Sequence, residues 1–197
     1  MTNSQIPTLL LALTMMIVPG CSNGPSGPNP RVVMDTSMGN VTIELFQDRA
    51  PITVDNFLRY VDAKHYDGTI FHRVIPDFMI QGGGMEPGLK ERITLAPIKN
   101  ESSNGLANER GTIAMARTND PDSASAQFFI NVNDNARLNR SAANAGYAVF
   151  GRVVDGMDVV DKIRYMQTAR RGPHDDVPVQ DVMIRSVRRV ETPKQVK

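Results

Sequence analysis

The chain has 197 residues, of which 41% are hydrophobic and 22% are charged, and its formal net charge is +1. This length and composition predict one globular domain with a sizeable core. The near-zero charge gives no electrostatic reason to expect a nucleic-acid partner. The single cysteine, Cys21, excludes an internal disulfide and any zinc site built from several cysteines.

The first thirty residues contain an apolar run of the kind found in export signals, although they include no Lys, Arg, Asp or Glu. The apolar run Leu9–Val18 is too short to span a membrane as a helix, which takes about twenty residues, but it suits the hydrophobic region of a secretory signal. Val18–Cys21 resembles the bacterial lipobox, in which the cysteine becomes the acylated first residue of the mature chain. We therefore predict a signal peptide over residues 1–20 and a lipid on Cys21. A plain cleaved signal with an incidental free cysteine is the alternative.

Composition also predicts the domain boundaries. Residues 22–30 consist of Gly, Pro, Ser and Asn, so residues 21–30 are expected to be a lipidated cysteine followed by a flexible linker. The folded domain is expected over residues 31–190, followed by a tail at 191–197. The protein would then be exported and lipid-anchored to the bacterial cell envelope, facing the periplasm.

The first half of the domain combines strands with one helix. Apolar runs at residues 32–34 and 41–45 flank a turn and predict a hairpin. Pro51 suits the start of a helix, and the apolar residues from Val54 to Val61 fall at i, i+3, i+4 and i+7. Two further strands are expected within Ile70–Gly83, joined by a turn at Pro76 and Asp77.

The second half begins with a long loop and continues with strands. Residues 82–111 are rich in Gly, Pro, Asn, Ser and Lys, which predicts a long excursion with little regular structure. Further strands are expected at 111–116, 127–132, 148–154 and 182–187, with a second helix after Asp155-Gly156. Many short strands and two helices favour an all-β barrel or sandwich. Phe128 and Phe129 should point to opposite faces of their strand.

The stretch Phe71–Gly83 contains the strongest candidate for a binding site. Arg73 and Gln81 lie on either side of the turn and can return to the same face of a hairpin. Phe78 and Met79 can form an apolar floor between them. A small apolar pocket with a few polar groups is typical of a ligand site. From this stretch alone, a buried hairpin with a surface arginine is the alternative.

Four separated segments share their order and spacing with one known family. They are F-H-R-V-I-P-D-F-M-I-Q-G-G from Phe71, G-T-I-A-M-A-R-T from Gly111, S-A-Q-F-F-I-N-V from Ser125, and Y-A-V-F-G-R-V-V-D-G-M-D-V-V-D-K-I from Tyr147. Together they resemble the cyclophilins, peptidyl-prolyl cis-trans isomerases, and bacterial members most of all. The resemblance implies a mainly-β fold, a closed eight-stranded antiparallel β-barrel capped by two α-helices. It also implies that the active groove lies on the outer face of the barrel.

The resemblance further implies roles for individual residues. The catalytic positions are Arg73, Phe78, Gln81 and Phe129. The substrate-binding positions are Met79, Ala116, Arg117, Thr118, Gln127, Leu138 and Tyr147. Two positions depart from many eukaryotic members, which carry a tryptophan where this chain has Arg137 and a histidine where it has Tyr147. These departures bear on substrate preference more than on the core chemistry.

The implied activity is isomerisation of X-Pro bonds in exported or envelope proteins, assisting their folding. The expected partners are proline-containing unfolded polypeptides and, through Cys21, a membrane. We expect no cofactor and a monomer. Two alternatives remain: a binding module or holdase without useful turnover, and a purely structural envelope lipoprotein.

The histidines do not suggest metal chemistry. His65, His72 and His174 are spread along the chain without metal-ligand spacing, so we expect no metal site. His72 adjoins Arg73 but should alternate to the other face of the strand, which favours a structural role.

Overall fold

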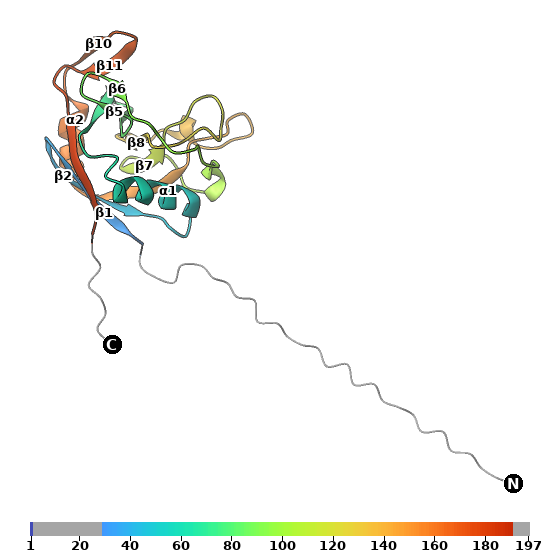
Figure 1. Ribbon diagram of the computed structural model, residues 1–197. Helices are drawn as coiled ribbons and strands as arrows, with labels where there is room; N and C mark the ends of the chain where they lie inside the picture. The colour runs from blue at the N-terminus through green and yellow to red at the C-terminus, as the bar shows by residue number, and fades with distance from the viewer. Residues whose placement is uncertain (2–28, 191–197) are drawn as a thin grey trace, which may run out of the picture.

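Eight strands form a closed barrel at the centre of the structure (Figure 1). The computed structural model describes residue 1 and residues 29–190. The predicted signal peptide, Cys21 and the predicted tail lie outside the described residues. The barrel strands are β1 (Arg31–Thr36), β2 (Gly39–Leu45), β3 (Thr69–Ile75), β4 (Met79–Gly82), β7 (Thr112–Met115), β8 (Phe128–Asn131), β9 (Val149–Asp155) and β12 (Met183–Arg189).

Around the barrel the strands follow the order β1-β12-β3-β4-β8-β7-β9-β2, and their pairings are antiparallel. Two α-helices accompany them, α1 (Pro51–Asp62) and α2 (Met157–Arg164), with 3₁₀ turns at Ser102–Asn104 and Ala136–Leu138. The predicted mainly-β fold, a closed eight-stranded antiparallel barrel with two helices, is confirmed. Within residues 29–190, no helix is both long and apolar enough to cross a membrane.

Alternate residues of the barrel strands point inward and form one buried apolar core. On β2, Val41, Ile43 and Leu45 are fully buried, whereas the residues between them are half-buried. This is the two-residue period of a strand with one face in the core. Both helices add to the same core, α1 with residues such as Phe57 and α2 with residues such as Ile163.

Phe57 lies within an aromatic group that holds α1 against the barrel. Its ring centroid lies 5.1 Å from that of Tyr66, 5.9 Å from that of Phe128 and 5.2 Å from that of Phe150. The Tyr66 hydroxyl donates a hydrogen bond to the main-chain oxygen of Ala126 at 3.0 Å, which satisfies a polar atom inside the core. Burial raises the pKa of Tyr66 well above its ordinary value, so this hydroxyl stays protonated.

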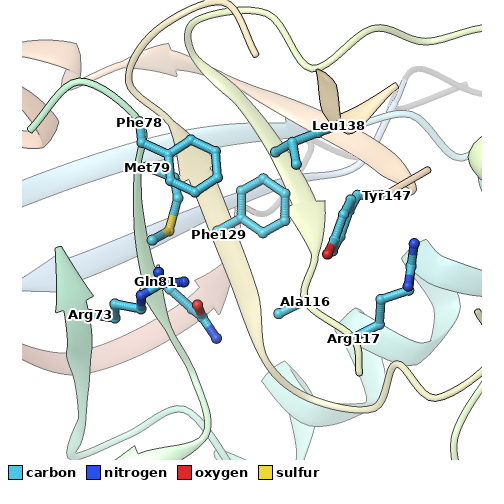
Figure 2. A pocket seen from close by; sticks show the side chains of 9 residues that line it. All are labelled: Arg73, Phe78, Met79, Gln81, Ala116, Arg117, Phe129, Leu138 and Tyr147. Carbon is cyan, nitrogen blue, oxygen red and sulfur yellow. The ribbon is translucent and has the colours of Figure 1, made fainter. Parts of the chain in front are cut away.

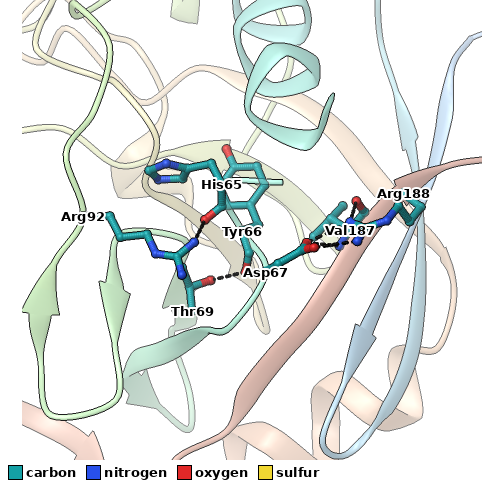
Figure 3. Close-up of polar contacts among 7 residues, drawn as sticks. All are labelled: His65, Tyr66, Asp67, Thr69, Arg92, Val187 and Arg188. Carbon is teal, nitrogen blue, oxygen red and sulfur yellow. Dashed lines mark hydrogen bonds and ion pairs between the residues drawn. The ribbon is translucent and has the colours of Figure 1, made fainter. Parts of the chain in front are cut away.

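The turn between α1 and β3 is held from two sides (Figure 3). Arg188 on β12 forms a two-pronged ion pair with Asp67, at 2.8 and 2.5 Å, and this hydrogen bonding lowers the pKa of the Asp67 carboxyl. From the other side, the Arg92 guanidinium donates to the main-chain oxygen of His65. The start of β3, which leads to the candidate site, is therefore fixed by residues distant in the sequence.

The long loop at residues 82–111 has little regular structure, as predicted, and it also caps α1. Its short strands are β5 (Met85–Glu86) and β6 (Lys90–Glu91). The carboxylate of Glu101 accepts hydrogen bonds from the main-chain N–H groups of Ile52 and Thr53, at 3.1 and 2.7 Å. A carboxylate at this place satisfies free N–H groups and favours the helix dipole.

One hairpin has no counterpart among the predicted elements. It consists of β10 (Thr168–Arg171) and β11 (His174–Pro178) and projects at one edge of the structure (Figure 1). Its strand β11 contacts β3. Its sequence, T-A-R-R-G-P-H-D-D-V-P, is highly charged and shows no apolar alternation. The hairpin is stabilised by the contact of β11 with β3. Because this contact is tertiary, no apolar alternation within the hairpin sequence predicts it.

A β-bulge interrupts β3 next to the candidate site. In the pairing with β4, Phe71 lies opposite Gly82 and Arg73 lies opposite Gln81, so His72 is the extra residue. The regular alternation predicted for His72 and Arg73 therefore does not hold. The His72 side chain is 5% exposed.

Burial gives His72 a pH-dependent effect on stability. Burial, together with the neighbouring His174 and the positive charge of Arg73, lowers the pKa of His72 to about 4. Between that value and the ordinary histidine value of about 6.5, the unfolded chain binds a proton that the folded protein does not. The free energy of unfolding should therefore rise with pH across this interval and level off above it.

We predict that the His72→Gln variant loses less stability than the parent protein when the pH falls from 7 to 5. The difference should be about 2 kcal/mol in the free energy of unfolding. Denaturant unfolding of both proteins at both pH values measures it. An identical pH dependence in the two proteins would show that His72 is not buried as a neutral side chain.

Candidate functional site

Outward-facing residues of five adjacent strands form a continuous row across the barrel. Paired residues run from Arg73 on β3 to Gln81 on β4, Phe129 on β8, Ala114 on β7 and Val149 on β9. Three of the five strands contribute by regular pairing, whereas Arg73 on β3 and Val149 on β9 each follow an irregularity in the strand register. The prediction that Arg73 and Gln81 return to the same face of a hairpin is confirmed.

The apolar residues of the row, Phe129, Ala114 and Val149, belong to a second apolar cluster, separate from the barrel core. Phe129 is buried in this outer cluster together with Met79, whereas its neighbour Phe128 lies in the core. The expected opposition of Phe128 and Phe129 is therefore confirmed. Residues Phe78 and Leu138 are only partly buried and pack against the outer cluster, which leaves apolar surface facing solvent.

A pocket of about 190 Å³ opens over this cluster (Figure 2). Its lining residues are Arg73, Phe78, Met79, Gln81, Ala116, Arg117, Phe129, Leu138 and Tyr147. Pockets for drug-sized ligands usually measure about 300–1,000 Å³, so this one suits a single small ring or side chain. The structure thus brings nine of the predicted site residues together, although their individual roles stay predictions.

The remaining two predicted residues, Thr118 and Gln127, line a neighbouring hollow of about 200 Å³. This hollow shares Gln81 and two other residues with the first pocket. The Gln81 side-chain amide donates to the side-chain oxygen of Gln127 at 2.9 Å. Thr118 is held by Ser123, whose hydroxyl lies 2.9 Å from the Thr118 main-chain nitrogen. An extended ligand could occupy both hollows and meet Gln81 between them.

Two arginines cover aromatic rings at the edge of the pocket. The guanidinium carbon of Arg117 lies 4.4 Å from the ring centroid of Tyr147, and that of Arg137 lies 4.4 Å from the ring centroid of Phe78. Both distances are in the range of cation–π contacts. Arg137 therefore covers one face of Phe78.

A chain of asparagines supports the apolar side of the pocket. The Asn135 side chain donates to the main-chain oxygen of Phe78 at 2.8 Å and to Asn131 at 2.7 Å, and Asn131 donates in turn to Asn108. These three asparagines are buried. Asn135 also precedes the 3₁₀ turn that carries Leu138. Sequence reasoning did not identify this support, because isolated asparagines in loops resemble ordinary turn residues.

The chemistry available in the pocket is that of oriented noncovalent contacts. Arg73 offers planar N–H donors beside an apolar surface formed by residues such as Phe129 and Met79. The pocket lining contains no serine, cysteine, histidine or carboxylate that could act as a nucleophile or general base. Across the described part of the chain, no group of three or more His, Cys, Asp or Glu residues is placed to hold a metal ion.

Comparison with known proteins identifies the family. Residues 31–189 match the family described as cyclophilin type peptidyl-prolyl cis-trans isomerase/CLD. A peptidyl-prolyl cis-trans isomerase of Acinetobacter baylyi is 62% identical over 159 residues, which cover 81% of this chain and 85% of the relative. Peptidyl-prolyl cis-trans isomerase B of Escherichia coli is 58% identical over 159 residues, covering 79% and 97% of the two chains.

Solved structures agree with the fold. A crystal structure of a Cryptosporidium parvum cyclophilin type peptidyl-prolyl cis-trans isomerase, determined in the presence of the dipeptide Ala-Pro, matches with a TM-score of 0.68. The match covers 82% of this chain and 99% of that one, at 24% sequence identity. At this identity the match supports the fold alone.

Gly84 provides a test of the link between Gln81 and Gln127. A Cβ atom at Gly84 would lie 2.4 Å from the Gln127 Cγ, so the Gly84→Ala variant must displace that side chain and break the Gln81–Gln127 hydrogen bond. We predict about two- to tenfold weaker binding of an Xaa-Pro peptide, the usual range for one hydrogen bond. NMR titration gives the dissociation constant.

The matched control for this prediction is Gly88→Asn. No heavy atom lies within 4 Å of a Cβ at Gly88, and asparagine tolerates the positive φ of +81° at that position. Binding by this control should match that of the parent protein. Unchanged binding by the Gly84→Ala variant would show that the position of Gln127 does not matter for the ligand.

Proposed function

The chain belongs to the cyclophilin-type peptidyl-prolyl cis-trans isomerases, and from this premise we propose that it accelerates X-Pro bond rotation in exported or envelope proteins and so assists their folding. Its isomerase activity follows from the family and from relatives at 58–62% identity. The observation that supports the catalytic part of the proposal is the position of Arg73 at the edge of a small apolar pocket.

The proposed mechanism uses the change in the proline nitrogen during rotation. In the planar amide its lone pair is delocalised, which gives the C–N bond partial double-bond character and a barrier of about 18–20 kcal/mol. In the twisted transition state the nitrogen regains its lone pair and accepts a hydrogen bond. A donor that reaches this nitrogen therefore binds the transition state more tightly than the ground state, which lowers the barrier. Arg73 supplies this donor, since its guanidinium is permanently charged and carries several N–H groups.

The rest of the pocket holds the substrate while one side of the bond rotates. Phe78, Met79, Phe129 and Leu138 hold the pyrrolidine ring by apolar contact, because they form the outer cluster and its exposed edge. Gln81, fixed by Gln127, holds the carbonyl group next to the proline. The polypeptide on the Gln81 side of the proline extends over the neighbouring hollow. Proline-containing unfolded polypeptides are the substrates, and no cofactor takes part.

The cellular setting is proposed from the sequence that precedes the domain. Residues 1–20 act as a signal peptide, Cys21 carries the lipid, and residues 22–30 tether an isomerase domain at 31–190. The short apolar run Leu9–Val18, the lipobox-like Val18–Cys21 and the uncharged linker at residues 22–30 support this arrangement. A lipid anchor would hold a monomeric enzyme at the envelope, facing the periplasm, where exported chains fold. Stable attachment takes more than one acyl chain.

The catalytic proposal predicts different effects for two substitutions. The Arg73→Ala variant should isomerise bound peptide about ten- to a hundredfold more slowly, as expected for a lost charge-assisted hydrogen bond of roughly 1.5–3 kcal/mol, with little change in affinity. The Phe129→Ala variant should weaken peptide binding as well, since it removes pocket wall from both the ground and transition states. NMR exchange at saturating peptide, beside the dissociation constant, separates the two effects.

The Arg73→Lys variant serves as the control for charge. It keeps the positive charge but loses the planar fork, so it should recover part of the rate. If the Arg73→Ala variant binds tenfold more weakly yet isomerises bound peptide at the normal rate, Arg73 anchors the substrate and the mechanism is wrong. A parent protein that binds peptide without measurable exchange would favour a holdase.

The anchoring proposal predicts the behaviour of the Cys21→Ser variant. In a bacterial host, labelled fatty acid should enter the parent protein but not the variant, and the variant should leave the membrane fraction. The matched control is Ser22→Ala, which changes the neighbouring residue and should leave labelling intact. Membrane association that survives in the Cys21→Ser variant would contradict a lipid anchor at Cys21.

A further inference from the structure

The unpredicted hairpin of β10 and β11 brings a carboxylate to the candidate catalytic arginine. The Asp176 Oδ2 lies 3.7 Å from the Arg73 Nε, and the two side chains are 40% and 43% exposed. This distance exceeds that of a hydrogen bond, so the contact is an ion pair. Within residues 29–190, Arg73 makes no other ion pair.

The backbone of Asp176 has an unusual conformation. Its φ is +59°, in the left-handed region that side-chain-bearing residues rarely occupy, although aspartate and asparagine tolerate it better than most. Such conformations cost free energy and recur at functional sites. Here the conformation belongs to the residue whose carboxylate faces Arg73 from β11, the strand that packs against β3.

The adjacent carboxylate, Asp175, has a different partner. Its Oδ1 lies 3.6 Å from the Nε of Arg170, within the same hairpin, and its side chain is 68% exposed. The hairpin therefore carries two neighbouring carboxylates with similar ion-pair distances. One faces the pocket arginine and the other faces a residue that does not line the pocket.

We propose that Asp176 is a positioning residue for Arg73, an inference that rests on the catalytic role proposed for Arg73. The carboxylate approaches the Nε side of the guanidinium, so the terminal N–H groups remain available to the pocket. Arginine loses much rotamer freedom when it is held in one place. The ion pair with Asp176 restricts the Arg73 side chain before the substrate binds, so less rotamer freedom is lost on binding. It also keeps the N–H donors directed toward the position that the rotating nitrogen will occupy.

Two other roles for Asp176 lead to different results. A structural role, holding β11 against β3, would alter stability regardless of the residue at position 73. An opposing role, in which the carboxylate neutralises Arg73 and weakens it as a donor, would make removal of the charge accelerate the reaction. A double-mutant cycle with Arg73 separates these roles, because a positioning residue acts through the residue that it positions.

The test compares Asp176→Asn in the parent protein and in the Arg73→Ala variant. Asparagine keeps the size and the tolerance of positive φ but removes the charge, so the fold should be retained. We expect exchange of saturating Xaa-Pro peptide to slow about two- to fivefold in the parent background, the range of an exposed ion pair. In the Arg73→Ala background, the same substitution should have no effect. The parent-background difference should shrink at 1 M salt, where the Debye length is about 3 Å.

The Asp175→Asn variant is the matched control and should exchange peptide at the parent rate in both backgrounds. Asp176→Gly relieves the backbone strain and provides a second variant if the asparagine protein is unstable. Equal slowing in both backgrounds, no slowing, or acceleration would each overturn the positioning role. If the Arg73→Ala variant exchanges peptide at the parent rate, the catalytic role proposed for Arg73 is wrong. This result comes from the Arg73→Ala protein alone and is therefore distinct from any effect of the Asp176 substitution.

Discussion

The arrangement of the site depends on one extra residue in β3. If the pairing of β3 with β4 were regular from Phe71 onward, His72 would lie opposite Gln81 and Arg73 would turn toward the barrel core. The bulge instead keeps Phe71 in the core and places Arg73 in the outer row beside Gln81. A permanently charged side chain would be very unfavourable inside the barrel. The same feature therefore protects the core and gives the outer pocket its donor.

The two faces of the strands have separate tasks. Inward residues such as Phe128 fill a core that both helices complete, whereas outward residues such as Phe129 form the floor of the pocket. The core fixes the strands, and the outer cluster adds its own packing to the apolar part of the row. This rigidity suits a reaction without covalent steps, in which catalysis depends on holding a ring and one donor in fixed relative positions. Catalysis by positioning also explains how a pocket that contains no nucleophile or general base can belong to an enzyme.

Much of this organisation could be predicted from the sequence, because it depends on local period and on segments that resemble a known family. Alternation predicted most barrel strands and the opposed directions of Phe128 and Phe129, and the resemblance indicated the residues that the structure brings together. Contacts between distant segments could not be predicted in this way. Asp176 reaches Arg73 from a charged hairpin without apolar alternation, and Glu101 caps α1 from a loop. The bulge at His72 could not be predicted either, because none of the residue types around it indicates an interruption of the strand.

A crystal structure of the protein with a bound Xaa-Pro peptide tests the central claim most directly. Our account predicts that the pyrrolidine ring lies against Phe129 and Met79, with a terminal guanidinium nitrogen of Arg73 directed at the proline nitrogen. It also predicts that the carbonyl before the proline lies on the side of Gln81. A ring seated in the same pocket with the Arg73 guanidinium turned away, so that none of its N–H groups could reach the proline nitrogen as the bond rotates, would contradict the proposed stabilisation of the twisted amide.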